Sequence, residues 1–146
     1  MPRDHRRRSK TEIYIHVVWA TTRRSPFLAS AGIERRVHRC IHRAAERLGC
    51  AVLAINGMPD HVHLLVQIPA KLSVADLAQG VKGNSSRFAN ARLNLEEPFD
   101  WQDHYGAFSV SRRDVPKVRA YVQNQKQHHA ENTQWPALEE TDEEDA

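Results

Sequence analysis

The most constraining feature of the sequence is the run HVHLLVQI at residues 61–68, in which two imidazoles share one side of an apolar segment. Side chains alternate between the two faces of a β-strand, so Val62 and the aliphatic residues at every second position after it point to one face. His61 and His63 point to the other face, with Cα atoms roughly 7 Å apart. The chain therefore needs a sheet that packs a core on one face and presents two histidines on the other.

The remaining elements follow from the same kind of pattern. EIYIHVVWATT at residues 12–22 alternates as a strand, and residues 33–48 have helical spacing up to a C-terminal cap at Gly49. Residues 50–58 read as a strand that runs into a turn at Asn56-Gly57 and forms a hairpin with residues 61–68. The turn signal predicts a hairpin loop slightly longer than two residues.

The second half of the chain continues this alternation. Ser73 caps a helix that runs to about Leu93, with Gly80 indicating close approach to another element. A loop and a short strand at residues 107–111 follow, and Asp114 then caps a last helix that ends near His129. The order β-α-β-β-α-β predicts the α+β split βαβ arrangement of ferredoxin-like domains, an antiparallel sheet with an added C-terminal helix. One sheet face packs on two helices, and the other is free to build a site.

Length and charge indicate one domain with charged ends. The chain has 146 residues and a formal net charge of +3, and its last eight residues carry six carboxylates, so the rest of the chain carries about +9. We expect a flexible basic arm at residues 1–10, a catalytic domain at 11–132 and a disordered acidic tail at 133–146. A basic body suits a polyanionic partner, although an ordinary solvated surface explains the same charge.

The sequence also limits where the protein works. It has no apolar run long enough for a membrane span, and its basic N-terminus lacks the apolar segment of a secretory signal. Cys40 and Cys50 read as free buried thiols, which favours a cytoplasmic protein, with one disulfide between them as the alternative. No Walker loop or Rossmann glycine fingerprint is present, so no nucleotide cofactor is expected.

The two histidines alone leave two readings open. They are either strand histidines that hydrogen-bond to their neighbours, or two ligands for one divalent ion at about 2 to 2.2 Å per nitrogen. The HExxH motif and a Cys-x-x-Cys pair are absent, and Leu65 stands where a histidine-triad hydrolase would have its third histidine. A barrel amidohydrolase needs more than 146 residues.

The last predicted helix offers further polar groups. Tyr121 and Gln125 are four residues apart and share a helix face, which His128 and His129 continue one turn later. An ordinary surface helix with a half-buried tyrosine fits this pattern as well.

Together these segments resemble the HUH-type single-tyrosine transposases, in particular the REP-associated tyrosine transposases and their insertion-sequence relatives. The resemblance rests on MPDHVHLLV at 58–66 and on Tyr-x-x-x-Gln-x-x-His-His from Tyr121, and it extends over most of residues 14–129. It implies that His61, His63 and Gln125 bind the metal. It also implies that Tyr121 attacks a phosphodiester of single-stranded DNA to leave a 5′-phosphotyrosine, and that the protein is a homodimer.

Physical chemistry agrees with these implied roles. A phenol has a pKa near 10 and is a weak nucleophile at neutral pH, so an ion that polarises the scissile phosphate would help it. Imidazole and amide-oxygen ligands suit Mg²⁺ or Mn²⁺ better than a closed zinc site. For single-stranded or hairpin DNA we expect contacts from basic side chains and one stacking ring. These residues are Arg23, Arg24, Lys82, Arg87, Arg112, Arg113 and Tyr105.

The sequence is compatible with three functions. The leading hypothesis is a metal-dependent single-stranded DNA endonuclease and strand transferase that acts at hairpin or palindromic repeat DNA. The alternatives are a domesticated DNA- or RNA-binding protein without cleavage activity and a small metal-dependent nucleotide hydrolase. A protein that only binds has no chemical need for a tyrosine beside two histidines and a glutamine, and the basic surface disfavours the hydrolase.

Overall fold

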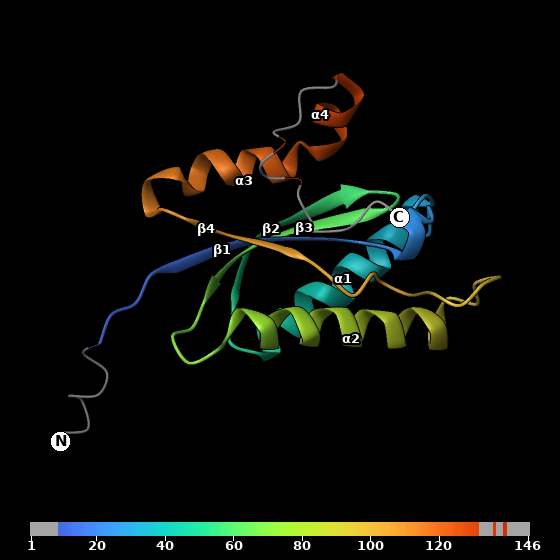
Figure 1. Cartoon of the computed structure of the whole chain (residues 1–146), viewed down its shortest axis with the longest axis horizontal. Coiled ribbons are helices and arrows are strands. Elements are labelled where there is room, and N and C mark those ends of the chain that lie inside the picture. Colours follow the sequence, from blue (N-terminus) through green and yellow to red (C-terminus); the bar gives the residue numbers. More distant parts are fainter. Residues whose placement is uncertain (1–8, 132–135, 137–138, 140–146) are drawn as a thin grey trace.

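The computed structural model describes residues 9–131, Pro136 and Glu139. Its elements, in chain order, are β1 Ile13–Ala20, α1 Ala31–Arg47, β2 Ala51–Met58, β3 His61–Ile68, α2 Val74–Arg92, β4 Gly106–Val110, α3 Val115–Gln123 and α4 Gln125–Glu131. The four strands form one antiparallel sheet in the order β2-β3-β1-β4 (Figure 1). The predicted β-α-β-β-α-β order and its α+β class are therefore confirmed.

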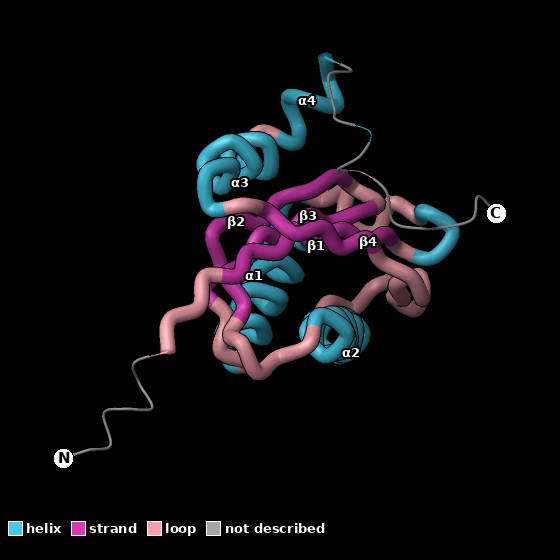
Figure 2. Tube along the Cα trace, turned by 60° about the vertical axis from the view of Figure 1, so that its left-hand side comes forward, coloured by secondary structure: helices cyan, strands magenta, loops and turns pink. Residues whose placement is uncertain are grey.

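Helices cover both faces of this sheet. Figures 1 and 2 show α1 and α2 on one side and α3 with α4 on the other. The larger core lies on the first side, where Val17, Trp19 and the alternate aliphatic residues of β3 pack against α1 and α2. On the second side Leu65 packs with Val118 and Val122 of α3. The second face, expected to be free, is in fact closed over by α3.

The ends and contacts of the first two helices follow the predicted signals. The Ser73 hydroxyl accepts a hydrogen bond from the backbone N–H of Asp76 at 3.0 Å, and Gly49 after α1 has the positive φ of +95° that a helix C-terminus favours. Gly80 lets α1 and α2 approach, because a Cβ there would lie 2.8 Å from Cδ1 of Leu48. The helical glycine is thus explained by helix packing.

The predicted hairpin turn at Asn56-Gly57 is wrong. Gly57 lies inside β2 and pairs with Val62, while Met58 pairs with His61, so the loop contains only Pro59 and Asp60. A Cβ on Gly57 would lie 2.2 Å from the carbonyl oxygen of His61. Glycine is therefore required at position 57 because two backbones approach closely there, and not because the chain turns at Asn56-Gly57.

The predicted last helix is also different in two respects. The Asp114 side chain makes no capping hydrogen bond, and the helix is preceded instead by a 3₁₀ turn at Arg112–Asp114 whose cap is the Ser111 hydroxyl. Asn124 has φ −104° and ψ 27°, which breaks the helix into α3 and α4. Tyr121 and Gln125 therefore lie on either side of a break rather than on one continuous helix.

Some expectations concern the ends and the cysteines. Cys40 and Cys50 are both free thiols, as predicted, but only Cys50 is buried and Cys40 is partly exposed. Burial raises the pKa of each. No helix among the described residues has the length and apolar character needed to cross a bilayer. Most of the predicted basic arm at 1–10 and of the acidic tail at 133–146 lies outside the described residues, so both remain predictions.

Replacement of Gly57 by alanine should destabilise the fold by about 2 kcal/mol or more, because the new Cβ collides with backbone that cannot shift without disturbing the β2–β3 pairing. Gly32 in α1 provides a matched control, since a Cβ there would have its nearest neighbour at 3.8 Å. Gly32→Ala should stabilise by roughly 0.5–1 kcal/mol. Urea unfolding of both variants measures the difference, and equal changes would contradict this role of Gly57.

Candidate metal and nucleophile site

The two histidines of β3 lie on the sheet face that α3 covers. His61 is 4% exposed and His63 is fully buried. Their ring centres are 5.1 Å apart. Buried imidazoles need hydrogen-bond partners, so the neighbouring side chains decide which nitrogen of each ring is left for a ligand.

Asp60 determines the orientation of His61. Its Oδ1 lies 2.8 Å from Nδ1 of His61, and its Oδ2 lies 3.5 Å from the Arg24 guanidinium. Burial alone would raise the pKa of Asp60, but the hydrogen bond to His61 and the Arg24 charge lower it overall. The carboxylate therefore accepts the Nδ1–H of His61 and directs Nε2 into the site. Among the described residues this Nε2 makes no hydrogen bond, although a carboxylate oxygen of Glu139 lies 3.4 Å away.

His16 on β1 plays the corresponding role for His63. Its Nε2 lies 2.9 Å from Nδ1 of His63, and the two rings stack with centres 5.1 Å apart. Burial, aided by the neighbouring His63, lowers the pKa of His16 to about 3, so His16 stays neutral and can accept the Nδ1–H of His63. Nε2 of His63 is then directed into the site, beside Nε2 of His61.

Tyr121 and Gln125 reach the same place from the two sides of the helix break. Both are buried, and the Tyr121 ring centre lies 6.1 Å from that of His63. His128 packs against Tyr121 with ring centres 4.6 Å apart. The Gln125 amide oxygen accepts from Nε2 of His129 at 3.1 Å, while its nitrogen points toward the centre of the site. The structure therefore brings all four predicted catalytic and metal residues together.

Glu139 is a further residue of the site that the sequence did not reveal. Its Oε1 lies 3.0 Å from Nε2 of His63 and 3.4 Å from Nε2 of His61. Its Oε2 accepts hydrogen bonds from the Tyr121 hydroxyl and, at 3.3 Å, from the Gln125 amide nitrogen. Burial would raise the pKa of Glu139, but the neighbouring His61 and His63 rings and the hydrogen bond from Tyr121 hold it well below its usual range. One carboxylate thus contacts every predicted member of the site.

The donor set fits a divalent metal ion. Nε2 of His61, Nε2 of His63 and a carboxylate oxygen of Glu139 lie within 4.8 Å of one another, close to the spacing of ligands around one ion. The buried Nε2 of His61 without a hydrogen-bond partner also suits a ligand role. The Asp60 carboxylate holds Nδ1 of His61 and the His16 imidazole holds Nδ1 of His63, and such partners are common around metal-binding histidines.

The segment that carries Tyr121 is attached to its own chain. The Asn56 side chain donates to the carbonyl of Gln123 at the end of α3, at 2.9 Å. Lys126 in α4 donates to Oε2 of Glu34 at 2.9 Å, to Oδ1 of Asn56 at 2.9 Å and to the Gly57 carbonyl at 3.1 Å. These bonds hold the helix break on β2 and α1, so Tyr121 stands beside the histidines of the same chain.

Of the predicted DNA contacts, Arg23 and Arg24 lie nearest the site. Both are exposed and occupy the 3₁₀ turn after β1 with positive φ values of 52° and 54°. Arg24 lines a hollow of about 460 Å³ together with Asp60, His61 and His129. An anionic strand could reach the histidines through this hollow.

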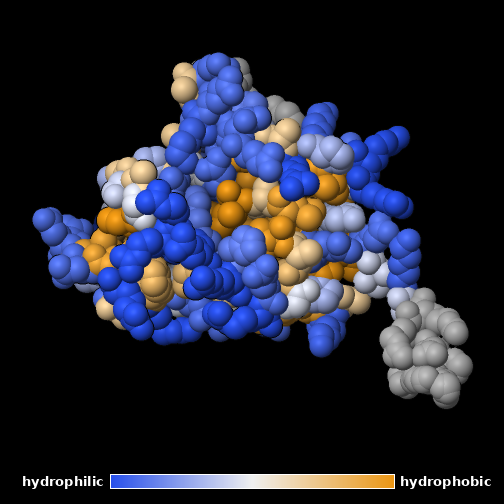
Figure 3. All heavy atoms as spheres, turned by 180° about the vertical axis from the view of Figure 1, so that it is seen from behind, coloured by the Kyte–Doolittle hydropathy of each residue, from blue (hydrophilic) through white to orange (hydrophobic). Residues whose placement is uncertain are grey.

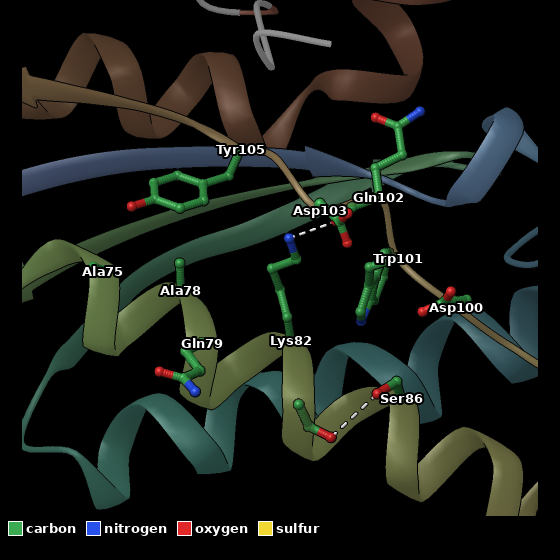
Figure 4. A pocket seen from close by; sticks show the side chains of 11 residues that line it. Ala75, Ala78, Gln79, Lys82, Ser86, Asp100, Trp101, Gln102, Asp103 and Tyr105 are labelled. Atoms are coloured by element: carbon green, nitrogen blue, oxygen red, sulfur yellow. Dashed lines mark hydrogen bonds between the residues drawn. The ribbon is translucent and has the colours of Figure 1, made fainter. Parts of the chain in front are cut away.

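Lys82 and Tyr105 lie away from the histidines. Figure 4 shows Lys82 extending from α2 toward the loop before β4, where its ammonium donates to the carbonyls of Gln102 at 2.6 Å and His104 at 3.3 Å. Burial lowers the pKa of Lys82. Its nitrogen also lies 5.9 Å from the centre of the Tyr105 ring, in a hollow of about 340 Å³. Lys82 therefore holds the loop in place in this structure.

The remaining predicted contacts are exposed side chains at other places. Arg87 lies on α2 and contacts the Asn84 side chain at 3.2 Å. Arg112 pairs with Glu12 at 3.2 Å, and Arg113 is exposed beside it. On β1, Tyr14 pairs with Val110 of β4, close to Arg112, and Ala20, six residues further along, pairs with His61. The two arginines therefore lie roughly 20 Å from the histidines.

Loss of the Lys126 contacts should loosen the helix break. For Lys126→Gln we expect backbone amides of α3 and α4 to exchange roughly tenfold faster, because three bonds to β2 and α1 are lost. Hydrogen exchange followed by mass spectrometry measures this. Lys71→Gln, at an exposed position outside the site, should leave the rates unchanged. Unchanged protection of α4 in Lys126→Gln would show that these bonds do not hold the segment.

Comparison with curated proteins identifies related sequences. The chain is 23% identical over 119 residues to the ISDra2 transposase TnpA of Deinococcus radiodurans, a match that covers 78% of this chain and 84% of that protein. It is 26% identical over 116 residues to the transposase for insertion sequence element IS200 of Salmonella typhimurium, covering 75% of this chain and 74% of that protein.

Two solved structures share the fold. A provisionally assigned transposase from Deinococcus radiodurans R1 aligns with a TM-score of 0.64 and 24% identity, covering 86% of this chain and 94% of that chain. A REP-associated tyrosine transposase bound to a REP hairpin aligns with a TM-score of 0.60 and 15% identity, covering 83% of this chain and 70% of that chain. The family described as "Transposase IS200 like" matches residues 9–125, which include the whole sheet, both histidines of β3 and Tyr121. The chain therefore belongs to the IS200-like transposase family.

Proposed function

We propose that this chain is a divalent-metal-dependent endonuclease and strand transferase for single-stranded DNA beside a hairpin or palindromic repeat. One observation carries the proposal: the Tyr121 hydroxyl and the imidazoles of His61 and His63 all contact the same carboxylate of Glu139. A nucleophile and a pair of metal ligands thus converge on one anionic group. The hairpin in the structure of a REP-associated relative supports the choice of DNA form.

Tyr121 is the proposed nucleophile. Its phenolic oxygen bonds to the phosphorus of the scissile phosphodiester while the bond from phosphorus to the 3′ oxygen breaks. The phenolic proton passes to solvent, and the departing oxygen takes up a proton to become a free 3′-hydroxyl. The 5′ phosphate remains on Tyr121, so the bond energy is kept for resealing. Attack of a 3′-hydroxyl on the phosphotyrosine then restores the strand and the tyrosine.

His61, His63 and Gln125 are the proposed metal ligands, and Glu139 supplies a further oxygen in the DNA-free chain. The bound ion, Mg²⁺ or Mn²⁺, would stabilise the negative charge that grows on the phosphate oxygens. The Gln125 amide oxygen now accepts from His129, so ligation by Gln125 requires its amide to turn over. Asp60 and His16 hold the two imidazoles with Nε2 directed to the ion.

The expected homodimer is part of this proposal. Each chain already holds Tyr121 beside His61 and His63. Each subunit of such a dimer would therefore carry a complete site rather than borrow the tyrosine of its partner.

Replacement of Tyr121 by phenylalanine should abolish covalent protein–DNA adducts, because the attacking oxygen is removed. Binding of the same DNA should remain within about twofold. The assay is a denaturing gel after incubation with a labelled single-stranded oligonucleotide that carries a hairpin, with Mn²⁺ or Mg²⁺. Tyr14→Phe, the same change on β1 outside the site, should form adducts at the normal level.

Two outcomes would contradict this assignment. Undiminished adduct in Tyr121→Phe would show that another group attacks the phosphate. Absence of adduct in the unsubstituted chain, with tight hairpin binding under every metal condition, would favour the protein that binds nucleic acid without cleavage.

Metal binding should depend on both proposed oxygen ligands, Gln125 and Glu139. Calorimetric titration of the DNA-free chain with Mn²⁺ should show at least tenfold weaker binding for Glu139→Gln and for Gln125→Ala, since each loses an oxygen ligand. His63→Ala should lose binding altogether. Asp103→Asn, at an exposed loop position, is the control and should bind normally. Normal affinity in Glu139→Gln would remove Glu139 from the ligand set.

A further inference from the structure

His16 is a buried polar residue whose place in the core needs an explanation. It lies on β1, an interior strand of the sheet, and is fully buried. Figure 3 shows apolar side chains gathered at the level of the sheet, with hydrophilic residues above and below them. A histidine at this level removes two polar nitrogens from water, which is unfavourable unless both find partners. A leucine would fill a similar volume without that penalty.

Within the described part of the chain, only one of the two His16 nitrogens has a partner. Its Nε2 lies 2.9 Å from Nδ1 of His63, whereas its Nδ1 makes no hydrogen bond. The neighbouring ring on β4, Phe108, has its centre 6.1 Å from that of His16 and carries no lone-pair acceptor. A buried nitrogen without a partner destabilises the fold. The contact with His63 is therefore what the histidine provides at this position.

The strand register explains why the support of His63 comes from position 16. Val18 lies directly opposite His63 in the β1–β3 pairing, and Ala20 lies directly opposite His61. Neither side chain has a polar atom. His16 is the next residue on the same face of β1 and reaches His63 diagonally. The two rings stack at an interplanar angle of 17°, so the contact fixes the plane of the His63 ring as well as its bonded nitrogen.

This contact supplies what a metal ligand at position 63 requires. A neutral imidazole that binds an ion through Nε2 carries its proton on Nδ1, and that N–H needs an acceptor. Asp60 is the acceptor for His61, at 2.8 Å, and His16 occupies the same position for His63. Without His16, the proton of His63 is free to stay on Nε2, where Glu139 accepts it at 3.0 Å. A protonated Nε2 cannot bind an ion.

We propose that His16 is a positioning residue that prepares His63 to bind the metal ion, and that its burial lowers the stability of the fold. This rests on the proposed function for the ligand role of His63, and it adds a residue of β1 on which metal affinity depends. His16 acts through His63 and is not itself a ligand. Its loss should therefore weaken metal binding without removing any group from the ion.

The test separates metal affinity from fold stability in the full chain. His16→Leu removes both nitrogens and keeps a side chain of similar size. His16→Gln keeps a neutral acceptor, the amide oxygen, at about the same reach and should restore the contact. Val17→Ala is the matched control, because Val17 is the next residue of the strand and is buried in the core on the opposite face. Calorimetric titration with Mn²⁺ measures affinity, and urea unfolding in the presence of a chelator measures stability.

For His16→Leu we expect Mn²⁺ to bind roughly 10–100-fold more weakly, with a urea midpoint no lower than that of the unsubstituted chain. His16→Gln should bind Mn²⁺ within about threefold of the unsubstituted chain. Val17→Ala should show the reverse pattern, a lower urea midpoint with normal Mn²⁺ affinity. In the adduct assay, His16→Leu should need correspondingly more Mn²⁺ for half-maximal rate, while the rate at saturating Mn²⁺ stays within about threefold.

Three results would overturn the proposal. Normal Mn²⁺ affinity in His16→Leu, with metal-dependent adducts in the unsubstituted chain, would remove the role of His16 and leave the proposed function standing. Equal weakening in His16→Leu and Val17→Ala would show that metal binding merely follows fold stability. Absence of Mn²⁺ binding in the unsubstituted chain would contradict the metal site of the proposed function and this inference together.

Discussion

Two imidazoles buried on one sheet face are the constraint on which the rest of the site depends. A buried imidazole without partners is costly, and His61 and His63 together require several. Asp60 and His16 engage their Nδ1 atoms, and Glu139 approaches their Nε2 atoms. Each of these partners comes from a different part of the chain. The hairpin, the first strand and a residue near the C-terminal end must all be in place before the two rings can be buried.

The fold was readable because alternation and helical spacing are local properties. His16 could also have been found, because its neighbours Ile15 and Val17 face the helices and so His16 must share the face of His61 and His63. The hairpin loop was misplaced because glycine has two uses, positive φ and close approach, and only the structure shows which one Gly57 serves. Sequence letters do not distinguish them.

The helix break at Asn124 and the place of Glu139 in the site were not predicted, because both depend on contacts between distant parts of the chain. The break at Asn124 coincides with bonds from Asn56 and Lys126, which connect segments about seventy residues apart, and helical spacing carries no record of them. Glu139 stands fourteen residues after Gln125 and belongs to no periodic segment. Among six carboxylates in the last eight residues, nothing in the sequence singles out the one that enters the site.

The position of Glu139 constrains how DNA can enter the proposed reaction. Its carboxylate accepts the Tyr121 hydroxyl and lies against both Nε2 atoms, which are the groups that a scissile phosphate would need. Two anions cannot occupy the same place beside these groups without strong repulsion, so a phosphate has to replace the carboxylate. Arg24, at the rim of the same hollow, is held by Asp60 and leaves the replacement to be driven by binding elsewhere. Contacts that hold the substrate away from Tyr121 would supply that binding energy without competing with Glu139.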